Sequence, residues 1–241
     1  MSRRCRVTDP VLGRPIRWDV IAKPGGVRRV VVLSQADELA FARSVAGAVP
    51  AICRALGQES HANRVVAWDR ARGPILEPWR RARRRWQREV RLLAIDAPSL
   101  AVTDARACYA SISPGVICDR LRALGAPQYC VDQIDAWLRV FRDAGVDGLP
   151  IGPVASAPLA DAVLIAGDDA IRAAGAAHAR WVDDVAIFAP DARTRAAAFD
   201  ALRRAWASLG LEVHDGKTLL LDTHAAGVHL KASPATSSAL R

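Results

Sequence analysis

The sequence of 241 residues predicts an α+β fold in which a small antiparallel sheet packs on helices. Two segments, 16–33 and 180–189, carry short apolar runs on either side of a turn signal, a pattern typical of β-hairpins. Several longer segments carry apolar residues at helical spacing. The chain has no internal repeat and no long linker, so we do not expect it to divide into independent domains.

The first hundred residues combine a hairpin, two helical segments and a strand. Turn residues and β-branched runs predict the strands, and periodic apolar residues predict the helices. In order, we expect two strands within 16–33 joined at Pro24-Gly25-Gly26, a helix over 37–56 that Pro50 interrupts or divides, irregular chain over 60–73, a strongly basic helix over 77–94 and a strand over 100–104.

The second part of the chain is predicted to be mainly helical, with one hairpin at its centre. Ser113-Pro114 is an N-cap followed by a proline at the first helical position, which begins a helix. The remaining elements are helices over 131–144, 155–174 and 194–209, the hairpin over 180–189 with two aspartates at its tip, and a strand pair around the turn signal Asp215-Gly216.

The bulk composition indicates an intracellular globular protein with a polyanionic partner. Half of the residues (51%) are hydrophobic, which fits a globular protein rather than a disordered one. The formal charge of +9 and the pI of about 10.1 favour nucleic acid as a partner. No apolar run reaches the roughly 20 residues of a membrane span, and no signal peptide is recognisable. The cysteines form no metal-binding pattern and are expected to be reduced thiols in the cytoplasm: Cys5, Cys53, Cys108, Cys118 and Cys130.

Two aspartate-bearing strands are the candidate source of chemistry. Asp104 ends one predicted strand, and Asp183-Asp184 lies between apolar stretches in the later hairpin. A pair of adjacent carboxylates alone would more often be a polar hairpin turn. The segments that accompany this pair change that interpretation.

Four segments follow one another in a recognisable order: VTDARACYASI (102–112), GLPIGPVASAPLADAVL (148–164), RWVDDVAIF (180–188) and LGLEVHDGKTLL (209–220). This succession resembles the palm motifs of reverse transcriptases, lettered A to D. Upstream, AKPGGVRRVVVL is similar to the hairpin of their fingers and ADELAFARSVAGAVPAI to the helix that follows it. The resemblance covers most of the chain and is to the bacterial retron, abortive-infection and group II intron-like types.

The resemblance implies a right-hand fold of palm and fingers and a two-metal site. Two Mg²⁺ ions, for which Mn²⁺ can substitute, would assist the attack of a primer 3′-hydroxyl on a deoxynucleotide. Hard cations require oxygen ligands, and so carboxylates from neighbouring strands must converge. By the resemblance, Asp104 and Asp183 bridge the metals, Asp184 assists, and the Ala105 carbonyl is a further ligand. Lys217 corresponds to a candidate proton donor to pyrophosphate, with a plain surface lysine as the alternative.

Further residues are expected to bind the incoming nucleotide. Tyr109 occupies the position of an aromatic steric gate that favours deoxynucleotides, and a core tyrosine is the alternative. Ile151 and Gly152 stand in motif B, where most of the family has glutamine and glycine; an apolar residue there is similar to error-prone, diversity-generating enzymes. Cations of the fingers hairpin would clamp the triphosphate: Lys23, Arg28 and Arg29.

The basic helix over 77–94 is a candidate nucleic-acid surface. Its charges fit either a solvated surface helix or a contact to a phosphate backbone. The arginines assigned to this contact are Arg80, Arg81, Arg83, Arg84 and Arg85.

The resemblance also predicts the domain organisation. Fingers are expected over 1–97, with helices of 113–147 contributing, and a palm over 98–233 that includes a candidate primer-grip hairpin at HAAGVHLKA (224–232). A tail over 234–241 would follow, without the helical thumb that holds the duplex. A partner subunit, a structured RNA or a second copy is therefore expected to replace the thumb, docking near Val228 and Leu230.

The function implied is RNA-directed DNA synthesis, with an RNA template, a DNA or RNA primer and deoxynucleoside triphosphates as partners, in a setting of bacterial phage defence. Two alternatives remain open at this point. One is a template-independent nucleotidyl transferase or an error-prone enzyme of the diversity-generating type. The other is a non-catalytic nucleic-acid-binding remnant, against which the retention of three aspartates, Tyr109 and Lys217 argues.

Overall fold

The computed structural model describes residues 10–23 and 26–222. It confirms a mixed fold of helices and small antiparallel sheets. The elements are β1 (Arg17–Lys23), β2 (Gly26–Val32), α1 (Gln35–Ala46), α2 (Val49–Ala55), β3 (Val65–Asp69), β4 (Gly73–Leu76), α3 (Trp79–Asp96), β5 (Ser99–Thr103), α4 (Cys108–Ser111), α5 (Pro114–Ala123), α6 (Gln128–Asp143), α7 (Ser156–Ala173), β6 (Ala177–Trp181), β7 (Asp184–Ala189), α8 (Ala192–Ala207), a 3₁₀ turn (Asp215–Lys217) and β8 (Leu219–Asp222).

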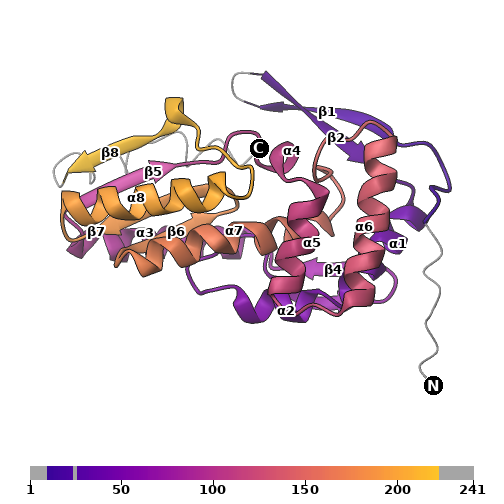
Figure 1. The fold of residues 1–241 in the computed structure, drawn as a ribbon, viewed down its shortest axis with the longest axis horizontal. Helices are drawn as coiled ribbons and strands as arrows, with labels where there is room; N and C mark the ends of the chain where they lie inside the picture. Colours follow the sequence, from indigo (N-terminus) through magenta and orange to yellow (C-terminus); the bar gives the residue numbers. More distant parts are fainter. Residues whose placement is uncertain (1–9, 24–25, 223–241) are drawn as a thin grey trace.

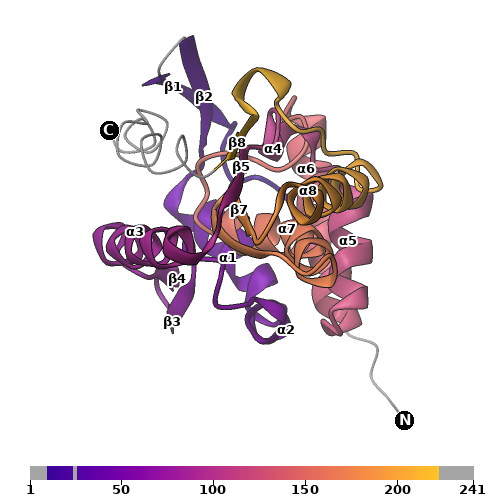
Figure 2. The same ribbon diagram turned by 90° about the vertical axis from the view of Figure 1, so that its left-hand side faces the viewer.

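A four-stranded antiparallel sheet in the order β6-β7-β5-β8 is the centre of one half of the molecule (Figure 1). Side chains alternate between the faces of a strand, so each face collects its own core. Helices α7 and α8 cover one face, against Ala101, Val185 and Ile187, and α3 covers the other, against Leu100 and Trp181. Figure 2 shows the sheet between α3 on one side and α7 and α8 on the other.

The other half of the molecule consists of α1, α5 and α6 beside the β1–β2 hairpin (Figure 1). Aromatic rings hold these helices together: Phe41 lies 5.0 Å from Phe141 and 5.7 Å from Trp137, centroid to centroid. Phe41 and Phe141 are completely buried. Such tilted and edge-on ring pairs add to the stabilisation that burial itself provides.

Local signals placed several element boundaries correctly. Pro50 lies in the first turn of α2, and the predicted helix over 37–56 is divided into α1 and α2. The Ser113 hydroxyl accepts a hydrogen bond from the Val116 N–H at 3.4 Å and begins α5. The hairpin over 180–189 is present as β6 and β7, joined by the two-residue turn Val182-Asp183, so that Asp184 is the first residue of β7.

Two predictions about local structure are wrong. The segment 60–73 is not irregular throughout, because β3 and β4 form a hairpin whose turn is held by Asp69, which accepts from the N–H groups of Ala71 and Arg72. The turn signal Asp215-Gly216 forms no hairpin. It folds as a 3₁₀ turn, and β8 pairs with β5 rather than with the chain before the turn.

Some predictions concern chain outside the described residues. These are the turn at Pro24-Gly25, the candidate primer-grip segment 224–232 with Val228 and Leu230, and the tail 234–241. Among the described residues, none of the helices is both long and apolar enough to cross a membrane.

Candidate active site

The sheet brings the three predicted aspartates to one edge. β5 pairs antiparallel with β7 in a register that sets Thr103 opposite Val185, so Asp104, the next residue, lies beside Asp184. Alternation along the strands places Asp104 after Val102 and Asp184 before Ala186, on the face that packs on α3. Asp183 lies in the adjoining turn.

The aspartates destabilise each other's charge. Burial, together with the charge of Asp104, raises the pKa of Asp183. Burial and the charges of Asp183 and Asp104 raise the pKa of Asp184 to about 7. Two carboxylates that resist ionisation next to a third are an environment in which a bound cation is strongly favoured.

Lys217 supplies part of the missing positive charge. Its ammonium group pairs with one carboxylate oxygen, Oδ2, of Asp104. The other oxygen, Oδ1, is buried without a hydrogen-bond partner among the described residues. An orphaned oxygen beside two further carboxylates fits a hard divalent cation such as Mg²⁺, which prefers oxygen ligands.

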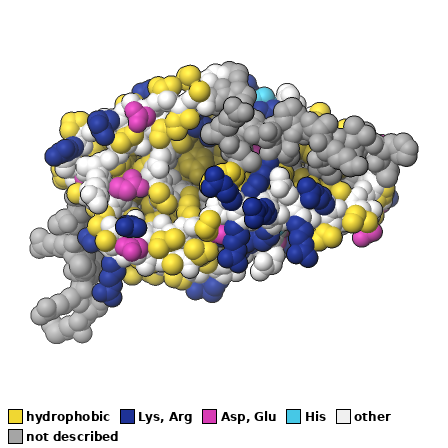
Figure 3. Space-filling model, turned by 180° about the vertical axis from the view of Figure 1, so that it is seen from behind, with side chains coloured by type: hydrophobic (Ala, Val, Ile, Leu, Met, Phe, Trp, Pro, Cys, Tyr) yellow, Lys and Arg dark blue, Asp and Glu magenta, His cyan; other side chains and the backbone are white. Residues whose placement is uncertain are grey.

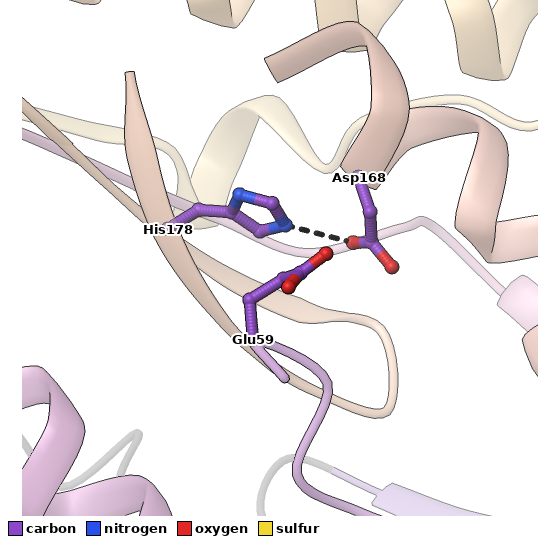
Figure 4. A group of neighbouring side chains, drawn as sticks. All are labelled: Glu59, Asp168 and His178. Carbon is purple, nitrogen blue, oxygen red and sulfur yellow. Dashed lines mark hydrogen bonds and ion pairs between the residues drawn. The ribbon is translucent and has the colours of Figure 1, made fainter. Parts of the chain in front are cut away.

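A different group of three ligand-type side chains lies closer together than the aspartates do. Glu59, Asp168 and His178 place their ligand atoms within 4.8 Å of one another, and theirs is the one such trio in the part of the chain that the structure describes (Figure 4). His178 Nε2 lies 3.1 Å from Asp168 Oδ1. Arg172 lies 3.2 Å from Glu59.

This trio is better explained as part of a buried ion-pair network than as a metal site. The guanidinium of Arg180, which is completely buried, donates to both oxygens of Asp168 at 2.8–3.0 Å. It also donates to Asp161 at 2.9 Å. A cation here would have to displace that guanidinium from the carboxylate it already neutralises.

Arg180, Asp161 and Asp168 were not identified from the sequence. The signal that could have revealed them is the occurrence of two aspartates seven positions apart in the otherwise apolar segment of α7, which places both on one buried helix face. A buried carboxylate requires a partner, and Arg180 was the nearest cation before the aspartate pair.

Tyr109 and the loop 148–152 lie next to each other. The Tyr109 carbonyl accepts a hydrogen bond from the Leu149 N–H at 2.8 Å. Burial raises the pKa of Tyr109, and the charges of Asp161 and Asp183 add to this effect, so the ring lies within electrostatic reach of the aspartate turn. The half-buried Ile151 presents its carbonyl to the Val31 N–H at 2.6 Å. A side chain at Gly152 would collide with the backbone of Val31.

The cations of the β1–β2 hairpin differ in their surroundings. Arg28 is exposed, and its charge partly offsets the rise in pKa that burial causes in both Asp183 and Tyr109. Arg29 stacks on the Trp18 ring, 4.1 Å from its centroid. Lys23 is the last residue of β1, and its side chain is outside the described part of the structure. Of the two arginines, Arg28 is therefore the one with an electrostatic link to the aspartates.

The arginines of α3 fall into two sets. Arg83 is buried and lies over the rings of Trp86 and Trp181, at 4.3 and 5.3 Å, and Arg85 pairs with Glu77 at 2.8 Å. The others are exposed: Arg80, Arg81 and Arg84. Figure 3 shows Lys and Arg side chains gathered on the face that carries α3, beside a hollow lined mainly by hydrophobic side chains.

Ala105 is buried directly after Asp104 and forms a β-bridge with Val213. The Asp104 carbonyl accepts from the His214 N–H at 2.8 Å, and the Arg106 N–H donates to the Glu212 carbonyl at 2.7 Å. These bonds fix the chain on both sides of the aspartate. They also bring the segment that carries Lys217 next to it.

The raised pKa of Asp184 predicts a pH-dependent change in stability. The folded state binds the Asp184 proton more tightly than the unfolded state does. The stability that this proton contributes is therefore present at low pH and is lost as the pH rises from about 4 through about 7. We expect Asp184→Asn to raise the unfolding free energy at pH 8 by about 2 kcal/mol, roughly half of what the full pKa change amounts to, because the side chain is part exposed. Urea denaturation at pH 5 and pH 8 without divalent cations measures this. An equal effect of the substitution at both pH values would contradict it.

Comparison with known proteins finds similarity in structure only. No protein-family model matches the chain, and no curated protein matches it. A telomerase from Candida albicans, solved in complex with a TWJ fragment of telomeric RNA, has 11% sequence identity and a TM-score of 0.50, over 85% of this chain and 41% of that one. An apo telomerase from Candida tropicalis, truncated from its C-terminal domain, has 12% identity and a TM-score of 0.56, over 88% of this chain and 51% of that one.

The chain thus spans about half, or less, of the length of these telomerases. Telomerase is a reverse transcriptase, and the likeness shows that this chain has a reverse-transcriptase-like polymerase fold. At this level of identity it shows the fold alone. The site has to be argued from the residues present.

Proposed function

We propose that the protein is an RNA-directed DNA polymerase that adds deoxynucleotides to a primer 3′-hydroxyl. The observation that carries this proposal is the meeting of Asp104, Asp183 and Asp184 at one edge of the β6-β7-β5-β8 sheet, on a reverse-transcriptase-like fold. In this proposal the sheet with α7 and α8 is the palm, and the β1–β2 hairpin with α1 and α2 belongs to the fingers.

The residues of the site have separate tasks in such a reaction. Asp104, Asp183 and Asp184 would hold two Mg²⁺ ions, which lower the pKa of the attacking hydroxyl and stabilise the leaving pyrophosphate. Lys217, which pairs with Asp104, would give a proton to the leaving pyrophosphate. Arg28 would contact the triphosphate from the side of the hairpin.

Primer extension tests the proposal and separates it from its alternatives. The protein is incubated with Mg²⁺, deoxynucleotides and a primer on an RNA template, on a DNA template or on none. Extension that follows the RNA sequence supports the proposal. Untemplated addition would identify a nucleotidyl transferase instead, and binding without extension under all three conditions would identify a non-catalytic nucleic-acid-binding protein. The bacterial type and the role in phage defence stay predictions.

The position of Tyr109 predicts a change in sugar selectivity. We expect Tyr109→Ala to raise the use of ribonucleotides relative to deoxynucleotides by about tenfold or more, equivalent to ~1.4 kcal/mol, because the ring no longer excludes a 2′-hydroxyl. The ratio of kcat/KM values for the two nucleotides measures this. Tyr109→Phe, which keeps the ring, is the control, and an unchanged ratio in the alanine variant would remove the gate assignment.

The exposed arginines of α3 predict a change in salt dependence. Replacing Arg80, Arg81 and Arg84 with glutamine should reduce the slope of log affinity against log salt concentration by about one for each arginine that contacts a phosphate. Arg83 is left in place because it is buried. The control variant loses the same charge elsewhere, because glutamine replaces three exposed arginines of α5 and α6: Arg122, Arg139 and Arg142. Equal slopes in the two variants would mean that α3 is a solvated surface.

A further inference from the structure

The side chain of Arg180, in β6, joins the turn that carries Asp183 to α7. Nη1 of Arg180 donates to the Val182 carbonyl at 2.8 Å and to Asp161 at 2.9 Å. The remaining nitrogens of the guanidinium bind Asp168. The fixed fork of an arginine thus joins two carboxylates of one helix to the backbone of the aspartate turn.

The turn requires such support. Val182 has φ of +56°, a left-handed conformation that is uncommon for residues other than glycine and that a β-branched residue adopts only under constraint. Val182 immediately precedes Asp183, so any rotation of its backbone changes the direction of the Asp183 side chain. Nothing in the residue's own preference would keep the turn in this conformation.

The network is electrostatically well matched to this task. Burial alone would lower the pKa of Arg180, but Asp168 and Asp161 raise it above its ordinary value, so the guanidinium is charged at all accessible pH values. Burial alone would raise the pKa of Asp168, yet Arg180 and His178 hold it below its ordinary value. Glu59 and His61 add backbone hydrogen bonds to Arg180, at 2.8 and 3.0 Å.

We infer that Arg180 is a positioning residue for the aspartate site: with Asp161 and Asp168 it holds the Val182 carbonyl from the α7 side of the sheet and thereby sets the directions of the Asp183 and Asp184 carboxylates. The consequence for metal binding rests on the proposed function. The anchoring of the turn by Arg180 does not rest on the proposed function, and the anchoring and the metal binding are measured separately.

The test removes the anchor without leaving a buried charge unpaired. The variant Arg180→Met, Asp161→Leu, Asp168→Asn replaces the ion pairs with groups of similar volume and retains an oxygen for His178, an exchange that is often nearly neutral for stability. The matched control removes a pair from the surface of the same helix, Arg172→Met with Asp169→Asn. Circular dichroism and thermal melting establish that both variants fold.

Hydrogen exchange measures the anchoring itself. In the triple variant, the amides of 182–184 should exchange at least about tenfold faster, a loss of ~1.4 kcal/mol of local protection, while those of β5 stay unchanged. In the control variant, the amides of 182–184 should exchange at the rate of the parent protein. Turn amides that exchange at the parent rate in a folded triple variant would overturn the inference. If the triple variant does not fold, Arg180→Lys decides instead, since it keeps the charge but cannot bind both carboxylates and the carbonyl, and an unchanged rate there has the same meaning.

Metal titration and kinetics then test the consequence. Mn²⁺ binding that is lost in Asp183→Asn should weaken on the order of 10- to 100-fold in the triple variant, and kcat should fall with little change in the KM for deoxynucleotide. Parent-like Mn²⁺ affinity and kcat together with fast exchange would show that Arg180 holds the turn without positioning the carboxylates, and would overturn the inference. A parent protein that neither binds Mn²⁺ through Asp183 nor extends a primer would contradict the proposed function, and the exchange rates would still decide the anchoring.

Discussion

Asp183→Asn is expected to reduce nucleotide incorporation on the order of 10³-fold or more while leaving the fold intact. Asparagine has the shape of aspartate but lacks the charge that holds a divalent cation, and a metal ion contributes several kcal/mol to the stabilisation of a phosphoryl-transfer transition state. Folding is expected to be preserved because Asp183 lies in a turn and its ionised form is already disfavoured by burial and by Asp104. Single-nucleotide primer extension with Mg²⁺ measures the rate.

The control for this substitution is Asp143→Asn, which removes a carboxylate from the exposed C-terminal end of α6. It should incorporate nucleotides at the parent rate. Incorporation by Asp183→Asn within a few-fold of the parent would move the chemistry to other residues. Loss of activity with loss of the native circular dichroism spectrum would instead mean that the turn is required for folding.

Arg180→Met alone is expected to lower the unfolding free energy by about 3–5 kcal/mol, the largest effect on stability that we predict. The substitution leaves Asp161 and Asp168 buried with no cation between them, and both are almost completely shielded from water. The destabilisation should diminish at low pH, because Asp161, whose pKa is raised by burial, then becomes neutral. Equilibrium denaturation by urea at pH 5 and pH 8 measures both effects.

Arg172→Met is the matched control. Arg172 lies on the exposed part of α7, the helix that carries Asp161 and Asp168, and it forms ion pairs with Asp169 and Glu59. Surface pairs of this kind contribute about 0–1 kcal/mol. If the two substitutions destabilise the protein equally, the buried network is not what holds β6 to α7.

Local patterns in the sequence identified most elements. Proline and serine signals determined the division between α1 and α2 and the start of α5, since φ restriction and capping act within one turn of chain. Asp104 and Asp183 were predicted from the order of four segments that resembles the palm motifs of reverse transcriptases. Adjacent strands bring them together as expected, because an antiparallel register is set by the same alternation that can be read along each strand.

What the sequence could not determine were partners far apart along the chain. The pairing of β8 with β5, in place of a hairpin at Asp215-Gly216, depends on an open strand edge more than a hundred residues away. The burial of Arg83 over the rings of two tryptophans, within a helix predicted to be strongly basic, depends on α3 packing across the sheet.

Arg180 shows most clearly the difference between what the sequence predicts and what only the tertiary structure decides. By itself the sequence determined an aspartate pair in a hairpin, an α+β class and the order of the segments around it. Only the tertiary structure decided that Arg180 lies on the face of the sheet that α7 covers, bound to Asp161 and Asp168 of that helix. The physical reason is that hydrogen bonding and capping preferences act over a few residues, whereas a buried charge is tolerated only where the complete fold supplies its partner.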